Sequence, residues 1–237
     1  MNTFKSLTDM RKLVSFLAVA ITAVMVSGCA SLLASIATNP SFVVPDGTVY
    51  NGQTVRITKS GTCSYAWATS DPTHLPLVEK DGTAYITGHL DKDKYGRYES
   101  SRVATVTASN SGDATVKPIE QQVNIYSWQL AIYDSADKRI EDPLRLARNT
   151  QYTAKMVRVG GTSSSPNYVV IPKLYRSMTI GGEELISLNF SMGSSSFAKV
   201  EQSQLTYTFK TPSSASSTVT LNATLGDVTM GIKIATK

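Results

Sequence analysis

The chain has 237 residues, of which 41% are hydrophobic and 17% charged, with a formal net charge of +5. This length suffices for one large or two small domains. The basic residues form no run, so the sequence lacks the clustered positive surface that nucleic-acid binding requires, and we expect no nucleic-acid partner.

The first 28 residues predict an export signal. Lys5, Arg11 and Lys12 precede a mostly apolar run at residues 13–26. That run is too short to span a bilayer, which needs ~20 helical residues, but it suits the apolar centre of a secretory signal. Its removal leaves 209 residues and a net charge of +3, because three of the 23 basic and one of the 18 acidic residues lie within the signal.

The end of this signal, Val26-Ser27-Gly28-Cys29, resembles the lipobox of bacterial lipoproteins. The resemblance implies that Cys29 receives a lipid and becomes the mature N-terminus. Residues 30–41 show no sustained hydrophobic period, so we predict a flexible tether at residues 29–41. The resemblance also implies localisation in the cell envelope. In a Gram-negative host the outer membrane is favoured, because no aspartate follows the cysteine. An ordinary secretory signal is the alternative.

Cysteine content bears on how the fold is stabilised. Only Cys29 and Cys63 are present. With Cys29 assigned to the lipid, Cys63 has no partner in the chain and no disulfide framework is expected. Apolar burial must then stabilise the fold, and we predict that Cys63 is a small buried residue.

Strand patterns dominate the rest of the first half. Period-two alternation of Thr, Val, Ile and Tyr, interrupted by turn residues, predicts short strands. The predicted strands are Thr54–Thr58, Cys63–Ala68, Thr83–Thr87, Val103–Ala108 and Gln122–Tyr126. Strands of this length and spacing are typical of an all-β sandwich.

Residues 42–126 also resemble a bacterial immunoglobulin-like domain of the group 2 type. The resemblance rests on Val44-Pro45-Asp46-Gly47, on residues 67–72 around Trp67, and on the segments 81–88 and 103–108. It implies that Trp67 packs in the core between two sheets, and that the domain is a spacer or adhesive module. The charged residues 91–101 depart from the pattern.

The second half predicts another β-sandwich at residues 127–237. Its expected strands are Gln129–Tyr133, Gln151–Val159, Tyr168–Ile171, Leu185–Phe190 and Leu205–Phe209. The segments 160–166 and 213–217 are polar and are interpreted as surface loops. The predicted fold is therefore all-β, with two immunoglobulin-like β-sandwiches in tandem after a cleaved signal peptide.

The final hairpin can be predicted with its register. Apolar residues alternate with polar ones on both sides of Gly226-Asp227. A two-residue loop there places Leu225 opposite Val228 and Leu221 opposite Ile232, and gathers the apolar side chains on one face.

Catalytic and metal motifs are sparse. The two histidines, His74 and His89, lie beside turn residues and belong to no nucleophile or zinc motif, so we interpret them as structural or exposed. The segment Asp91–Gly96 begins like a calcium loop, but Arg102 stands where the bidentate glutamate is required. We interpret it as a solvated loop and expect no enzyme activity, no metal and no cofactor.

Aromatic residues offer the remaining candidate ligand contacts. Tyr95, Tyr98 and Trp128 could form a platform for stacking against sugars, with packing between the domains as the alternative for Trp128. The leading hypothesis is a non-enzymatic, lipid-anchored envelope protein that acts in adhesion or assembly with an envelope protein. The alternative functions are a carbohydrate-binding accessory lipoprotein and an envelope hydrolase.

Overall fold

The computed structural model describes residues 41–237, except 61–62, 163–164, 180–181, 195 and 215–216. The predicted signal, the lipobox with Cys29 and nearly all of the predicted tether lie outside the described residues. Among the residues described, no helix has the length and hydropathy of a membrane span. The described chain forms two compact units, a small one from Ser41 and residues 59–66 and 108–119, and a large one from the remainder.

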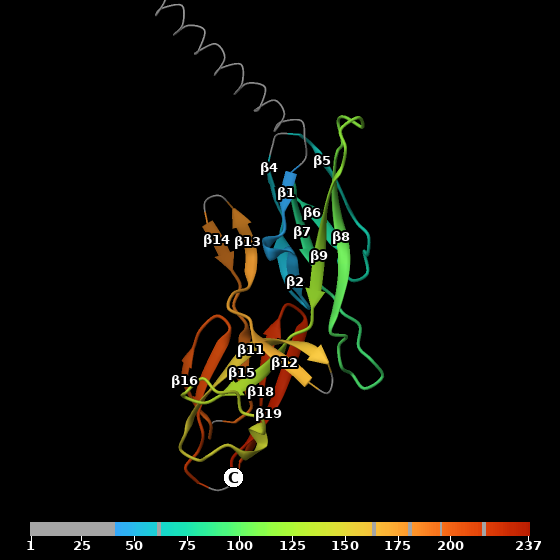
Figure 1. The fold of residues 1–237 in the computed structure, drawn as a ribbon. Helices are drawn as coiled ribbons and strands as arrows, with labels where there is room; N and C mark the ends of the chain where they lie inside the picture. Colours follow the sequence, from blue (N-terminus) through green and yellow to red (C-terminus); the bar gives the residue numbers. More distant parts are fainter. Residues whose placement is uncertain (1–40, 61–62, 163–164, 180–181, 195, 215–216) are drawn as a thin grey trace, which may run out of the picture. The chain divides into compact units, whose positions relative to one another are not determined.

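The strands up to residue 126 form three sheets (Figure 1), of four strands (β2-β9-β8-β5), three strands (β3-β7-β6) and two strands (β1-β4). Strands β2 and β9 run parallel. The bounds are β1 Ser41–Val43, β2 Thr48–Tyr50, β3 Thr54–Arg56, β4 Thr58–Ser60, β5 Tyr65–Thr69, β6 Leu77–Lys80, β7 Thr83–Thr87, β8 Ser101–Asn110 and β9 Ile119–Tyr126, with a 3-10 turn at Pro45–Gly47.

The strands after residue 128 form three further sheets. One has the order β10-β11-β17-β16 with β12 paired to β11, and the others are β15-β18-β19 and β13-β14. The bounds are β10 Gln129–Tyr133, β11 Gln151–Thr162, β12 Ser165–Val170, β13 Tyr175–Thr179, β14 Gly182–Leu185, β15 Asn189–Met192, β16 Ala198–Gln202, β17 Thr206–Lys210, β18 Thr218–Leu225 and β19 Val228–Ala235, with a 3-10 turn at Pro143–Arg145.

The structure confirms the all-β sandwich class, and the alternation seen in the sequence explains its cores. In the first half, Val49, Val55, Ile86, Val106 and Ile125 are fully buried. In the second half, one continuous cluster of buried residues joins β10, β11, β17, β18 and β19. Each of these strands contributes every second side chain to the cluster, as expected for a strand with one buried face. The domain boundary near residue 126 stays a prediction.

The predicted C-terminal hairpin is confirmed in detail. Leu225 pairs with Val228, Ala223 with Met230 and Leu221 with Ile232. The polar residues between them point to the other face, and Gly226 in the turn adopts a φ of +59°, a conformation that glycine tolerates at low cost. The hairpin therefore takes its register from its own sequence.

Two expectations about the second half were wrong. The segment 160–166 is not a loop for most of its length, because β11 extends to Thr162 and pairs Gly161 with Pro166 of β12. The segment 185–190 is not one strand, because β14 ends at Leu185 and β15 begins at Asn189. In segment 160–166, the pairing of β11 with β12 outweighs the turn-forming composition. In segment 185–190, one apolar run covers the end of β14 and the start of β15, which belong to different sheets.

Two expectations about the first half also need correction. Cys63 is partly exposed rather than buried. Trp67 is half-buried, with its ring edge-on to Phe42 at a centroid distance of 5.3 Å. The reason is that Trp67 lies on β5, the edge strand of its sheet, so that its inward face is only partly covered.

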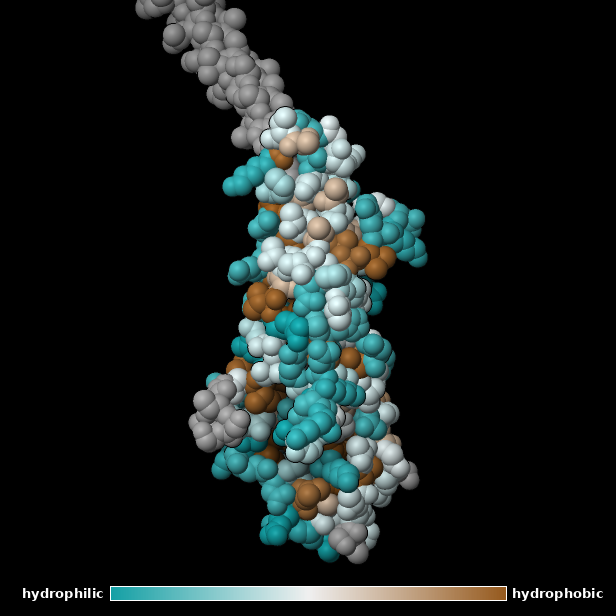
Figure 2. All heavy atoms as spheres, turned by 90° about the vertical axis from the view of Figure 1, so that its right-hand side faces the viewer, coloured by the Kyte–Doolittle hydropathy of each residue, from teal (hydrophilic) through white to brown (hydrophobic). Residues whose placement is uncertain are grey.

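Exposed apolar side chains do not form a broad patch on the face drawn in Figure 2. That face is mostly teal and white, with brown confined to small separate areas. The strongly exposed apolar residues come from many different elements, namely Val43, Val78, Val103, Leu144, Val169 and Val200. Scattered residues of this kind are normal for a protein surface.

Candidate functional site

The charged segment between β7 and β8, residues 91–101, is the region where the described chain gathers most of its candidate functional side chains. We call it the insertion. Its tip is closed by Asp93, whose Oδ1 accepts hydrogen bonds from the backbone N–H groups of Tyr95 at 2.8 Å and Arg97 at 2.9 Å. The backbone N–H of Arg97 holds the pKa of Asp93 below its usual range. Gly96 completes the turn with a φ of +77°.

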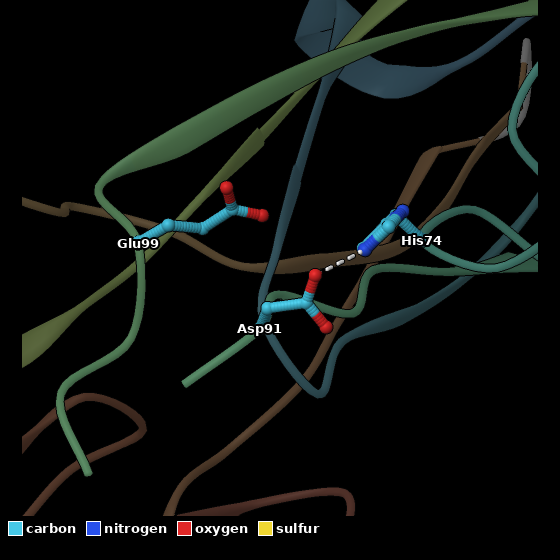
Figure 3. Close-up of side chains that lie close together, drawn as sticks. All are labelled: His74, Asp91 and Glu99. Atoms are coloured by element: carbon cyan, nitrogen blue, oxygen red, sulfur yellow. Dashed lines mark hydrogen bonds and ion pairs between the residues drawn. The ribbon is translucent and has the colours of Figure 1, made fainter. Parts of the chain in front are cut away.

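The base of the insertion is tied to His74, which lies in the turn before β6 and is 8% exposed. Its Nδ1 lies 2.9 and 2.8 Å from the two carboxylate oxygens of Asp71. Its Nε2 lies 3.0 Å from Oδ2 of Asp91, the contact drawn as a dashed line in Figure 3. The imidazole therefore bridges two carboxylates that lie 20 residues apart in the chain, at positions 71 and 91.

Arg102, near the start of β8, binds the other end of the insertion at Glu99. Its Nε and Nη2 donate to the two carboxylate oxygens of Glu99 at 2.8 and 3.1 Å. Its Nη1 and Nη2 also lie 3.6 Å from carboxylate oxygens of Asp71 and Asp91, respectively. Two cations and three carboxylates thus form one connected network, which we call the histidine network.

The network shifts the titration of its members in the expected directions. The hydrogen bond to Asp71, and then the one to Asp91, raises the pKa of His74 above its ordinary value. The same hydrogen bond lowers the pKa of Asp71. A protonated imidazole donates from both nitrogens, and this is the form that satisfies both aspartates. Nη1 of Arg102 also lies 2.9 Å from Nδ1, and the guanidinium can only donate in this contact.

His74, Asp91 and Glu99 are also the described side chains best placed to hold a metal. Their ligand atoms lie within 4.8 Å of one another, and one imidazole with two carboxylates suits a divalent cation. However, both carboxylate oxygens of Glu99 bind the guanidinium of Arg102, which places a positive charge where a cation would have to sit. We therefore interpret the cluster as a network of ion pairs.

The opposite side of the insertion borders a groove of about 590 Å³. This volume lies within the range of small-molecule sites. The groove is lined by three segments, namely Lys92, Asp93, Gly96, Arg97 and Tyr98 of the insertion, residues 127–129, and Thr229, Met230 and Gly231 of β19. Its walls are therefore polar and carry two cationic side chains.

The three predicted stacking residues differ in their accessibility. Tyr95 is 70% exposed, but its ring is covered by Lys94 and Arg97, 5.0 and 5.2 Å from the centroid. Tyr98 lines the groove, with Nζ of Lys92 at 4.7 Å over its ring. Lysine and arginine hold such positions by cation–π attraction, so the structure presents cations at these two rings.

Trp128 is the predicted ligand contact that the structure contradicts. It adjoins the groove but has no exposed surface. Its Nε1 donates to the backbone carbonyl of Asn51 at 2.9 Å, and its ring belongs to the core of the second half. Trp128 is therefore a core side chain, and the expected alternative, packing between two domains, stays a prediction together with the domain boundary.

Sequence reasoning missed the histidine network. The spacing of Asp71 and His74, three residues apart in a turn, was the one local signal. The partners Asp91 and Arg102 follow 17 and 28 residues after His74, and nothing in the sequence indicates that they meet. His74 is a buried histidine whose pKa is raised by its hydrogen bonds to Asp71 and Asp91, and its position in a network was not predicted from the sequence.

Comparisons with known proteins give structural matches alone. No protein-family model matches the chain, and no curated protein matches it. The solved structures that match include the extracellular cadherin domains 1–4 of protocadherin gamma B7 (13% identity, 84% of this chain, 49% of that chain, TM-score 0.26). They also include the D00-D0 domain of intimin (9% identity, 84% of this chain, 99% of that chain, TM-score 0.28).

An endo-fucoidan hydrolase, MfFcnA9 from glycoside hydrolase family 107, matches as well (12% identity, 84% of this chain, 34% of that chain, TM-score 0.32). The chain spans half or less of the length of the first three solved structures that it matches. At these identities and TM-scores, the similarities assign no function and no family to the chain.

Proposed function

We propose that this chain is a lipid-anchored protein of the cell envelope whose β-sandwich domains act without catalysis, in adhesion or in assembly with another envelope protein. The observation that carries the proposal is the string Val26-Ser27-Gly28-Cys29 after a basic start and a short apolar run. Two or more acyl chains on one cysteine anchor a protein stably.

The described part of the chain supports a binding role in two ways. It consists of sheets with buried cores, which is the kind of scaffold that presents loops to partners. In its most polar cluster, the histidine network, the charged side chains form ion pairs with one another. The proposal therefore assigns recognition to loops and sheet edges and assigns no residue to catalysis.

The test of the anchor is metabolic labelling with a palmitate analogue in a bacterial host. The wild type and Cys63→Ala should incorporate the label equally, whereas Cys29→Ala should lose it. Cys63→Ala is the matched control because Cys63 is the only other cysteine. Equal labelling of Cys29→Ala and the wild type would refute the anchor.

Protease treatment of intact cells then distinguishes where the domains act. Digestion of the wild type without lysis would support adhesion at the outer surface. Protection until the outer membrane is opened would support an assembly role in the periplasm. Release of Cys29→Ala from the membrane fraction serves as the control for anchoring.

The groove supports a second candidate, a carbohydrate-binding accessory lipoprotein. Tyr98, Lys92 and Arg97 come together at its wall, and polar and aromatic groups in a hollow of this size suit a saccharide. Loss of glycan binding in Tyr98→Ala, with binding retained in Tyr168→Ala outside the groove, would favour this function. Equal binding by both variants would exclude the groove.

A further inference from the structure

The histidine network connects the insertion to the rest of the first half through a histidine, the side chain whose ordinary pKa lies nearest neutral pH. His74 contributes the only imidazole in the network, and its two nitrogens contact Asp71 and Asp91. Asp71 lies in the same turn as His74, whereas Asp91 is the first residue of the insertion. Gain or loss of one proton therefore changes a contact between the insertion and the turn.

The two contacts differ in their exposure. The side chain of Asp71 is 23% exposed, and that of Asp91 is 71% exposed. Asp71 is further fixed by the backbone N–H of His74, which donates to its Oδ1. Nδ1 faces two carboxylate oxygens of Asp71 at 2.9 and 2.8 Å and one guanidinium nitrogen of Arg102 at 2.9 Å. Hydrogen bonds to charged groups are stronger where water is excluded, so we expect the two carboxylate oxygens to keep the proton of a neutral imidazole on Nδ1. Nε2 then presents a lone pair to the carboxylate of Asp91.

We propose that His74 acts as a pH-dependent latch on the insertion, holding Asp91 when the imidazole is protonated and releasing it when the imidazole is neutral. The charged groups that face the imidazole are Asp71, Asp91, Glu99 and Arg102. Arg102 stays protonated throughout the neutral range, because its hydrogen bonds to Glu99 raise its pKa further. His74 is therefore the group of the network that changes charge between pH 5 and 8.

The latch has a consequence for the groove, because Lys92, Arg97 and Tyr98 of the insertion line its wall. Loss of the contact with His74 leaves Asp91 with the longer 3.6 Å contact to Nη2 of Arg102. This loosens the end of the insertion that leads into Lys92, while Arg102 still holds Glu99 at 2.8 Å at the other end. This consequence for binding rests on the carbohydrate-binding function proposed above. The latch itself is measurable on the chain without any ligand.

The test is amide hydrogen exchange of the full chain in detergent between pH 5 and 8, with each rate divided by its intrinsic rate at that pH. The amides of Gly96 and Arg97 are hydrogen-bonded within the insertion. We expect their protection to fall roughly three- to tenfold as His74 loses its proton. Amides in β18 and β19 should not change.

Three variants make the test specific. Asp91→Asn changes an exposed side chain and should give, at pH 5, the low protection that the wild type reaches at pH 8. His74→Gln should give low protection at every pH. His89→Gln, which alters the other histidine, should keep the wild-type profile. Because Asp91→Asn leaves the buried imidazole in place, the test survives even if His74→Gln fails to fold.

Two results would overturn the latch. One is a wild-type profile that stays flat from pH 5 to 8, and the other is an Asp91→Asn profile that keeps its pH dependence. Nitrogen NMR of His74 adds an independent readout, since neutral His74 should carry its proton on Nδ1. Failure of glycan binding with an intact pH profile would refute the carbohydrate function and leave the latch standing.

Discussion

The β18–β19 hairpin and the insertion are two segments of the chain that are stabilised by different forces. In the hairpin, alternate side chains such as Leu221, Ala223 and Leu225 are buried at 0–3% exposure. In the insertion, residues 91–97 are exposed, and its conformation depends on Asp93 at the tip and on the histidine network at the base. Apolar burial is insensitive to pH, whereas ion pairs depend on protonation. We therefore expect the hairpin to determine global stability and the insertion to respond to conditions.

The largest effect should come from the hairpin core. Leu221→Ala removes a side chain with no exposed surface and should lower the free energy of unfolding by about 3 kcal/mol, since buried leucine-to-alanine changes cost ~2–5 kcal/mol. Urea unfolding measures this loss. Lys233→Ala, on the opposite face of the neighbouring strand, is the control and should change stability by less than about 0.5 kcal/mol.

A second test compares two glycines with similar backbone conformations. Gly52 has a φ of +84°, and a Cβ there would lie 2.2 Å from the backbone oxygen of Leu225, next to the turn of the hairpin. Gly82 has a φ of +70° with nothing within 4 Å of such a Cβ. Gly82→Ala should cost about 1 kcal/mol from backbone strain alone.

Gly52→Ala should cost clearly more, about 2–3 kcal/mol, because the backbone itself must move. Thermal unfolding of both variants gives the difference between them. Equal losses in the two variants would show that the close approach of Gly52 to the hairpin does not constrain the chain.

A third test measures how much the buried hydrogen bond of Trp128, beside the groove, contributes to the free energy of unfolding. Trp128→Phe keeps an aromatic ring but removes the N–H that bonds to the carbonyl of Asn51. An unsatisfied buried acceptor and a smaller ring should together cost about 1–3 kcal/mol. Chemical unfolding measures this cost. Tyr95→Phe, which alters an exposed aromatic residue of the insertion, should be nearly neutral.

The smallest expected effect is the pH dependence that His74 gives to global stability. Its pKa is raised in the folded state, first by Asp71. Its stabilising contribution is therefore fully present below the unfolded value of about 6.5 and is lost as pH rises through the folded pKa. The difference in unfolding free energy between the wild type and His74→Gln should shrink by about 1 kcal/mol or less from pH 6 to pH 8.

The reverse trend, a difference that grows with pH, would mean that the folded state favours neutral His74. Exposure limits the size of the effect, because the side chain of Asp91 is 71% exposed to water. Matched unfolding curves at three pH values are enough to determine the sign.

The sequence by itself determined the all-β class, most of the strands and the register of the last hairpin. These features depend on neighbours in the chain, since side chains alternate every two residues and a two-residue turn fixes which residues face each other. The segment 160–166 shows the limit of this information. Its Gly, Ser and Pro content predicted a loop, whereas the pairing of β11 with β12 extends strand structure into it.

Only the tertiary structure decided the site. His74 meets Asp91 and Arg102 across 17 and 28 residues, and Trp128 meets Asn51 across 77. No local sequence pattern predicts these long-range contacts, because they depend on how the sheets stack and on where the loops fold back. The same holds for exposure, since Tyr95, Tyr98 and Trp128 are alike as aromatic residues and differ only in what covers them. Their accessibility is a property of the packed molecule, as is the raised pKa of the buried imidazole.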